Sequence, residues 1–274
     1  MSTDSTAAPV PAGKTDKQKE GLWETIRFVL TVFLGALIIR SFILAPFNIP
    51  SGSMLPRLMI GDYLFVSKWS YGYSRYSLPF GIGGFDGRIF GGVPERGDVV
   101  VFRYPGRNED WVKRVIGLPG DMVEVRGGEV ILNGRPVQRT RIADYAMPTT
   151  PNSPCRRVGT EARENPSDCS YPRYRETLPG GRSYDVLDQG NGGPGDDRAA
   201  VRVPEGHVFV MGDNRDDSQD SRFSQDVGGV GLLPVDHVLG RALITFWSTD
   251  GSAAWLKPWT WFSAARWDRM GRTE

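Results

Sequence analysis

The sequence predicts a mainly β protein: an antiparallel, barrel-like β body with an inserted polar subdomain, anchored by one N-terminal transmembrane helix. Three observations indicate this fold class. A long uncharged segment lies near the N-terminus, short runs rich in Val, Ile, Phe and Tyr follow it, and Gly, Pro and Asn turn signals separate these runs. The 274 residues are enough for one large domain or two modest ones in addition to the anchor.

The N-terminal part is predicted to be a disordered tail followed by the anchor. Residues 1–21 are rich in Ser, Thr, Ala, Pro, Gly and Lys and show no periodic apolar pattern, which is typical of disorder. The transmembrane anchor is expected over residues 22–47. Charged residues are absent from Phe28 to Ile39. The whole apolar stretch of about 20 residues can cross a hydrocarbon core of roughly 30 Å.

Two other interpretations of this segment fit less well. A cleaved secretory signal needs small residues soon after its apolar core, but Pro46 and Phe47 follow here. A buried core helix would have a polar face, and this segment has none. The charges near the span give its direction: Lys14, Lys17, Lys19 and Arg27 lie before its uncharged part, and Arg40 and Arg57 after it. The positive-inside rule therefore predicts a cytoplasmic N-terminus, with residues 48–274 outside.

The β body is expected in residues 48–137 and 203–254. The predicted strands are Tyr63–Ser67, Asp98–Arg103, Trp111–Ile116, Met122–Val125, Glu129–Leu132, His207–Met211 and His237–Trp247. The dipeptide Asn133-Gly134 is a strong signal for a tight hairpin.

Residues 138–202 are predicted to form the inserted subdomain, because they are polar, rich in Arg, Pro and Gly, and weakly periodic. Both cysteines, Cys155 and Cys169, lie here in polar surroundings. Without accompanying histidines their spacing does not fit a zinc site. If this part of the chain is exported, a disulfide is plausible and would stabilise by roughly 3 kcal/mol. The alternative is two free surface thiols.

Two aromatic segments have two open interpretations. Residues 71–95 interleave Tyr, Phe and Gly, and the C-terminal tail, residues 255–274, carries several tryptophans. The rings could rest on lipid headgroups, where amphipathic aromatic side chains are favoured, or they could pack into the body.

The composition excludes some function classes. The net charge is +1, which gives no global field for nucleic-acid binding, and nothing suggests a metal or organic cofactor. Arginine is far commoner than lysine, with 27 arginines and 6 lysines. Because the lysines are so few, each can be considered as a functional group.

A serine-rich turn directly follows the anchor. The stretch Pro-Ser-Gly-Ser-Met at 50–54 would present a serine hydroxyl near the membrane surface. A hydroxyl is a weak nucleophile and needs a nearby base. Only two histidines are present, His207 and His237, and neither resembles a member of a catalytic triad. A neutral lysine is the recognised substitute, and it requires a pKa lowered from about 10.4 by burial.

Lys113 is the lysine that best fits this requirement. It lies in a predicted strand among Trp111, Val112, Val115 and Ile116. Lys68, which ends the strand after the serine turn, is the alternative. The other four lysines lie in the N-terminal tail or the aromatic C-terminus.

A third cluster, Met-Gly-Asp-Asn-Arg-Asp-Asp-Ser-Gln-Asp-Ser-Arg at 211–222, is dense in polar residues between apolar strands. A calcium loop starting at Asp213 would need Gly and Glu where Ser218 and Ser224 stand. An internal polar network that positions other groups is the better interpretation, and a solvated loop is the simplest alternative.

Together these segments resemble the bacterial type I signal peptidase family, the membrane-bound Ser-Lys endopeptidases. Four motifs occur in the family's order after the anchor: Pro-Ser-Gly-Ser-Met-Leu-Pro at 50–56, Arg-Gly-Asp-Val-Val-Val-Phe at 96–102, Lys-Arg-Val-Ile-Gly-Leu-Pro-Gly-Asp at 113–121 and Gly-Asp-Asn-Arg-Asp-Asp-Ser-Gln-Asp-Ser-Arg at 212–222. The resemblance covers about residues 25–135 and 203–248, and leaves the insertion and both ends unmatched.

The resemblance implies a role for each matched residue. Ser53 would be the nucleophile and Lys113 the general base. The Ser53 backbone N–H and the Ser51 hydroxyl would form the oxyanion hole. Ser218 would orient the lysine amine, and Asp220 and Arg222 would support that loop as an ion pair. The walls of the substrate pockets for small residues would include Phe47, Ile49, Met54, Leu58, Leu64, Val101, Trp111 and Val112. Trp111 stands where related enzymes often carry tyrosine.

The resemblance implies removal of N-terminal signal peptides from exported preproteins, after small residues in Ala-X-Ala sites. The expected setting is the bacterial inner membrane, with the catalytic domain in the periplasm. The expected partners are signal-peptide-bearing preproteins and the lipid bilayer, with the chain acting as a monomer. Two alternatives remain: a dedicated maturation peptidase of a conjugation or pilus system, and a non-enzymatic, membrane-anchored β domain.

Overall fold

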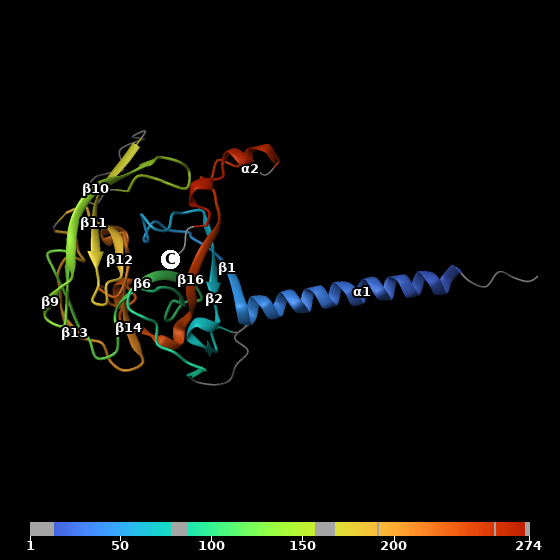
Figure 1. Cartoon of the computed structure of the whole chain (residues 1–274), viewed down its shortest axis with the longest axis horizontal. Coiled ribbons are helices and arrows are strands. Elements are labelled where there is room, and N and C mark those ends of the chain that lie inside the picture. The colour runs from blue at the N-terminus through green and yellow to red at the C-terminus, as the bar shows by residue number, and fades with distance from the viewer. Residues whose placement is uncertain (1–13, 78–86, 157–167, 191, 255, 272–274) are drawn as a thin grey trace, which may run out of the picture. The chain divides into compact units, whose positions relative to one another are not determined.

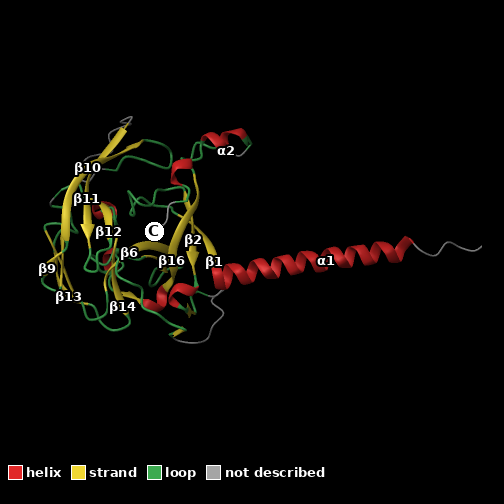
Figure 2. Ribbon diagram, in the orientation of Figure 1, coloured by secondary structure: helices red, strands yellow, loops and turns green. Residues whose placement is uncertain are grey.

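The computed structural model describes residues 14–77, 87–156, 168–190, 192–254 and 256–271, and confirms the mainly β fold. The chain divides into two compact units, Met1–Arg40 and Ser41–Glu274. The first contains the long helix α1 (Lys14–Ile38), and strands dominate the second (Figure 2). A short π-helical turn at Ile39–Ile43 follows α1 in sequence.

The helix is the predicted span, with different ends. Residues Trp23–Ile43 are long and apolar enough to cross a membrane. The predicted disordered tail is wrong for residues 14–21, because α1 begins at Lys14; Lys, Gln and Glu, which are good helix formers, dominate this turn. Residues 1–13 lie outside the described part.

The anchor was also predicted to extend too far at its C-terminal end. Residues 44–47 belong to strand β1 (Leu44–Asn48) and not to the helix. Pro46 has no backbone N–H and disfavours a helix interior, whereas an edge strand tolerates proline. β1 is at the edge of its sheet.

The main sheet has seven antiparallel strands in the order β1-β2-β16-β5-β6-β14-β15. Of these, β1, β2, β16, β6 and β14 are labelled in Figure 1. After β1, these strands are β2 (Asp62–Ser67), β16 (Val238–Ser248), β5 (Val99–Arg103), β6 (Asp110–Gly117), β14 (His207–Met211) and β15 (Leu233–Pro234). The predicted strands are confirmed to within one residue at each end. The sheet curls into a half-barrel, which brings strands from distant parts of the sequence around the serine turn.

A four-stranded sheet follows, in the order β13-β7-β8-β9. Its strands are β7 (Met122–Arg126), β8 (Glu129–Leu132), β9 (Arg135–Pro136) and β13 (Arg198–Arg202). Asn133 and Gly134 join β8 to β9 with φ angles of 53° and 77°, the left-handed conformation that the Asn-Gly signal predicts.

The insertion forms a three-stranded antiparallel sheet, β10 (Gln138–Pro148), β11 (Asp168–Thr177) and β12 (Ser183–Leu187), whose strands lie side by side in Figure 1. Its predicted C-terminal boundary is wrong, because residues 198–202 form β13, which pairs with β7. The insertion also belongs to the same compact unit as the body.

The remaining elements are short. The aromatic segment 71–95 forms a small hairpin, β3 (Tyr73–Ser74) with β4 (Arg88–Ile89), after a 3-10 turn at Trp69–Tyr71. Residues 78–86 of this segment lie outside the described residues. Further 3-10 turns are Arg215–Asp217, Gln225–Val227, Val235–His237 and Trp267–Arg269, and a short helix α2 covers Trp259–Ser263.

Candidate active site

The candidate site is built on the turn that follows β1. Asp62, at the start of β2, closes this turn by accepting a hydrogen bond from the Met59 N–H at 2.8 Å. Gly61 has a φ of +88°, and a Cβ there would lie 2.3 Å from the Thr249 carbonyl oxygen. The close approach therefore requires glycine at position 61.

Ser53 and Lys113 meet at this turn. The Lys113 Nζ lies 2.7 Å from the Ser53 Oγ and donates to the Val112 carbonyl oxygen at 3.0 Å. Both residues are buried, with 6% of Ser53 and 3% of Lys113 exposed. Lys68, the alternative lysine, donates instead to the Ser77 carbonyl oxygen. Both histidines are occupied elsewhere, with their Nδ1 atoms near backbone carbonyl oxygens.

Burial lowers the pKa of Lys113 to about 8. The negative charges of Asp220, Asp213 and Asp217 oppose this fall, and the positive charge of Arg222 adds to it. Within the described residues, no carboxylate oxygen contacts the amine. A lysine with this pKa has a substantial neutral fraction near pH 8, and a neutral amine can accept a proton from the adjacent hydroxyl.

Ser51 lies on the open side of the same turn. Its side chain is exposed, and its Oγ is 3.4 Å from the Ser53 Oγ. A hydroxyl here can donate a hydrogen bond to an oxygen that develops negative charge beside Ser53.

The loop after β14 supports the turn from behind. Asp220 accepts hydrogen bonds from the Gly212 N–H at 2.9 Å and the Ser218 hydroxyl at 2.8 Å, and pairs with Arg222 at 2.9 Å. Burial alone would raise the pKa of Asp220, but Arg222 and these hydrogen bonds lower it. A Cβ at Gly212 would lie 2.3 Å from the Ser218 Oγ and 2.5 Å from the Ser53 carbonyl oxygen. Only glycine allows the loop to approach the turn this closely.

One predicted contact differs in detail. Ser218 was expected to orient the lysine amine, but its hydroxyl donates to Asp220. Among the described residues, the amine's hydrogen-bond partners are Ser53 and Val112. The loop instead contacts the backbone carbonyl oxygens of the Ser53 turn.

Asn214 makes this connection, and no role was predicted for it from the sequence. Its backbone N–H donates to the Ser53 carbonyl oxygen at 3.0 Å, and its Nδ2 donates to the Gly52 carbonyl oxygen at 3.1 Å. It belongs to the Gly-Asp-Asn-Arg motif, which was the available signal.

Two buried ion pairs extend this support. Arg114 pairs with Asp213 at 2.6 Å, and Arg215 pairs with Glu176 at 2.5 Å. Glu176 lies in β11, so the insertion holds the loop that contacts the Ser53 turn. No pattern in the polar insertion marks Glu176 in advance.

Most of the predicted substrate-pocket residues come together. Ile49, Met54, Leu58, Leu64, Val101 and Val112 form one buried apolar cluster, with Phe47 packed against it. Trp111 does not join them: its ring packs 4.5 Å from that of Tyr104, beside a different cluster, and the Lys113 Nζ lies 5.4 Å from its centroid. Alternation along β6 sends Trp111 and Lys113 to the face opposite Val112.

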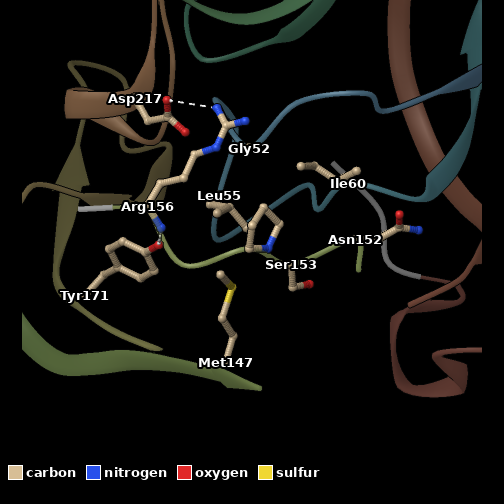
Figure 3. A pocket seen from close by; sticks show the side chains of 10 residues that line it. Gly52, Leu55, Ile60, Met147, Asn152, Ser153, Arg156, Tyr171 and Asp217 are labelled. Carbon is tan, nitrogen blue, oxygen red and sulfur yellow. Dashed lines mark hydrogen bonds and ion pairs between the residues drawn. The ribbon is translucent and has the colours of Figure 1, made fainter. Parts of the chain in front are cut away.

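The insertion also packs against the Ser53 turn, around a small cavity of about 10 Å³ beside Gly52 (Figure 3). There Arg156 lies 3.6 Å from Asp217, and its backbone N–H donates to the Tyr171 hydroxyl. Next to it, the structure joins Cys155 and Cys169 in a disulfide with Cα atoms 5.6 Å apart. The cavity has room for about one water molecule, so it is a small gap in the packing between the insertion and the turn, and not a substrate pocket.

Comparisons with known proteins show the family to which the chain is similar. The family model described as "Signal peptidase, peptidase S26" matches residues 22–247. The chain belongs to this signal peptidase family. Signal peptidase I of Rickettsia felis is 36% identical over 282 residues, covering 94% of this chain and 93% of the relative. Signal peptidase I of Rickettsia canadensis is 36% identical over 265 residues, covering 89% and 90%.

A crystal structure of signal peptidase I from Enterococcus faecalis also matches, with 24% identity, a TM-score of 0.29, and coverage of 55% of this chain and 97% of that one. The signal peptidase match contains all four motifs found in the sequence. It favours a serine-type peptidase over a non-enzymatic β domain.

Proposed function

We propose that this chain is a membrane-bound serine endopeptidase that removes N-terminal signal peptides from exported preproteins, with Ser53 as nucleophile and Lys113 as general base. The observation that carries the proposal is the 2.7 Å contact between the Ser53 hydroxyl and a buried amine whose pKa is lowered to about 8. The family assignment supplies the reaction class.

The chemistry follows from the two side chains. Neutral Lys113 takes the proton as the Ser53 Oγ attacks the scissile carbonyl carbon. The Ser53 backbone N–H and the Ser51 hydroxyl bind the resulting oxyanion, an arrangement worth about 3–4 kcal/mol per donor in other hydrolases. Protonated Lys113 then gives the proton to the leaving amine, and water hydrolyses the acyl-enzyme.

Supporting and binding residues complete the assignment. Ser218, Asp220 and Arg222 hold the loop behind the dyad. The cluster around Ile49 and Met54 is the proposed pocket wall for small side chains in Ala-X-Ala sites. Trp111, on the other face of β6, shapes the surroundings of the lysine and not this wall. An extended substrate would bind as an added strand, with alternate side chains entering pockets.

We further propose a single-pass anchor with a cytoplasmic N-terminus and a periplasmic catalytic domain, acting as a monomer against the bilayer. The charges before and after the span support the direction. Exposed aromatic side chains of the C-terminal tail support lipid contact: Trp259, Trp261, Phe262 and Trp267. The same tail also packs on the body, because Arg269 is buried against Asp62.

The test is cleavage of a model preprotein with an Ala-X-Ala site by wild type, Ser53→Ala and Lys113→Ala in detergent. Cleavage by wild type alone supports the proposal. Activity in Lys113→Ala with loss in Ser53→Ala would make another residue the base. A wild type that is inert on several such substrates would favour a dedicated maturation peptidase.

A further inference from the structure

A large polar cavity lies between the insertion and the body. Its volume is about 650 Å³, and its walls come from β11 and β12 on one side and from β5, β6, β16 and the turn after Ser53 on the other. Neither Ser53 nor Lys113 lines it. Ligand sites typically have volumes of roughly 300–1,000 Å³, so the cavity is large enough for a small molecule or a headgroup.

Arginines dominate the described lining of this cavity. They are Arg57, Arg114, Arg173, Arg175, Arg182 and Arg241. The acidic residues among the described lining are Asp98 and Asp185. Two further carboxylates pair with these arginines from outside the described lining, because Arg114 lies 2.6 Å from Asp213 and Arg182 lies 3.4 Å from Glu95. Six guanidiniums against four carboxylates leave a formal excess of two positive charges, in a chain whose net charge is +1.

Each aspartate is shared between two arginines. Asp98 lies 2.6 Å from Arg182 and 3.3 Å from Arg241. Asp185 lies 2.9 Å from Arg175 and 3.6 Å from Arg173. Each carboxylate therefore faces two guanidiniums, and the Asp98–Arg182 pair joins the two walls, because Arg182 belongs to the turn between β11 and β12. These pairs hold the arginine side chains in place at the cavity. Guanidiniums that are held close together repel one another, and an anion bound between them relieves this repulsion.

We propose that this cavity binds a phosphate group, supplied either by free phosphate or by the headgroup of an anionic phospholipid. The planar guanidinium offers a fork of N–H donors that matches phosphate oxygens two at a time. A tetrahedral anion with several acceptor oxygens can bridge arginines from both walls at once. Through Arg57, the bound anion would contact the segment that follows Ser53.

Calorimetric titration of inorganic phosphate into the full-length protein, in an uncharged maltoside detergent, tests the proposal. Sodium chloride at matched ionic strength is the blank. Arg175→Gln and Arg241→Gln, one from each wall, should each weaken phosphate binding about tenfold or more, because each removes a charge-assisted donor. Arg126→Gln is the matched control, since Arg126 is exposed, pairs with Glu124 and does not line the cavity.

An opposite substitution guards against misfolding of the arginine variants. Asp185→Asn removes one of the two lining carboxylates, so it should tighten phosphate binding severalfold. Dihexanoyl phosphatidylglycerol then distinguishes the sources. Displacement of phosphate by this lipid assigns the site to a headgroup, and saturable phosphate binding without displacement assigns it to free phosphate. Absence of binding by both probes, or equal binding by wild type and both arginine variants, overturns the proposal.

Discussion

The described residues include buried cations in two environments, one with a contacting carboxylate and one without. Arg215 and Arg269 are buried against carboxylates: Arg215 pairs with Glu176 at 2.5 Å, and Arg269 pairs with Asp62 at 2.6 Å. Lys113 is as deeply buried, but its contacts in the described chain are a hydroxyl and a carbonyl oxygen.

The pKa values follow from this difference. Burial alone would lower the pKa of Arg215, but Glu176 raises it above its usual value, and Asp62 does the same for Arg269. At Lys113 burial prevails and the pKa falls to about 8. A buried cation beside a carboxylate stays charged and holds structure, whereas one without a contacting carboxylate becomes able to lose its proton.

The largest effect is expected from replacing Lys113, whose amine must be neutral to accept a proton. Lys113→Arg should be as inactive as Lys113→Ala, with kcat/KM reduced by roughly 10⁴-fold or more, because arginine cannot deprotonate. Arg269→Lys is the matched control, since it changes the cation but keeps the charge that Asp62 needs. Cleavage rates of a model preprotein measure both. Substantial activity in Lys113→Arg would contradict the proposed role of the lysine.

A loss of stability is expected from removing a carboxylate partner. Glu176→Gln leaves Arg215 buried and uncompensated, which should cost roughly 3–5 kcal/mol and lower the melting temperature. Glu124→Gln, at an exposed ion pair with Arg126, should cost less than about 1 kcal/mol. Thermal unfolding of the full chain in detergent compares them. Equal melting temperatures for the two variants would show that the buried pair contributes no more to stability than the exposed pair.

The smallest effect is expected from a charge that acts on Lys113 without contacting it. Asp217 raises the pKa of Lys113, so Asp217→Asn should lower that pKa by less than about one unit and shift the rise of kcat/KM to lower pH. The neighbouring Asp216→Asn is the control, because Asp216 is not among the main charges that shift the pKa of Lys113. A shift to higher pH would contradict the sign of this effect.

The contact between Ser53 and Lys113 was the most predictable part of the site, whereas the Ser218 contact was predicted wrongly and Asn214 was not singled out. Lys113 could be chosen because the chain has six lysines and one of them lies in an apolar strand. The strand positions followed from β-branched and aromatic runs between turn signals. The half-barrel itself depends on which distant strands pair, such as β2 with β16, and no local pattern in the sequence gives that pairing.

Other features depend on long-range contacts that leave no local pattern. Glu176 and Arg215 are 39 positions apart, and Asp62 and Arg269 are 207 apart. A carboxylate in a polar segment looks solvated until the fold buries it. The C-terminal end of the anchor was predicted wrongly because an apolar run can form either a helix or a strand. Pro46 favours the strand here.

The pH dependence of kcat/KM for the wild type is the most direct test of the central claim, that Lys113 acts as a neutral base. The neutral fraction of a group with a pKa of about 8 rises tenfold per pH unit below that value. The rate should therefore climb about tenfold from pH 6 to 7 and level off above pH 9. A profile that is flat from pH 5 to 10, or that levels off near pH 7, would contradict the assignment.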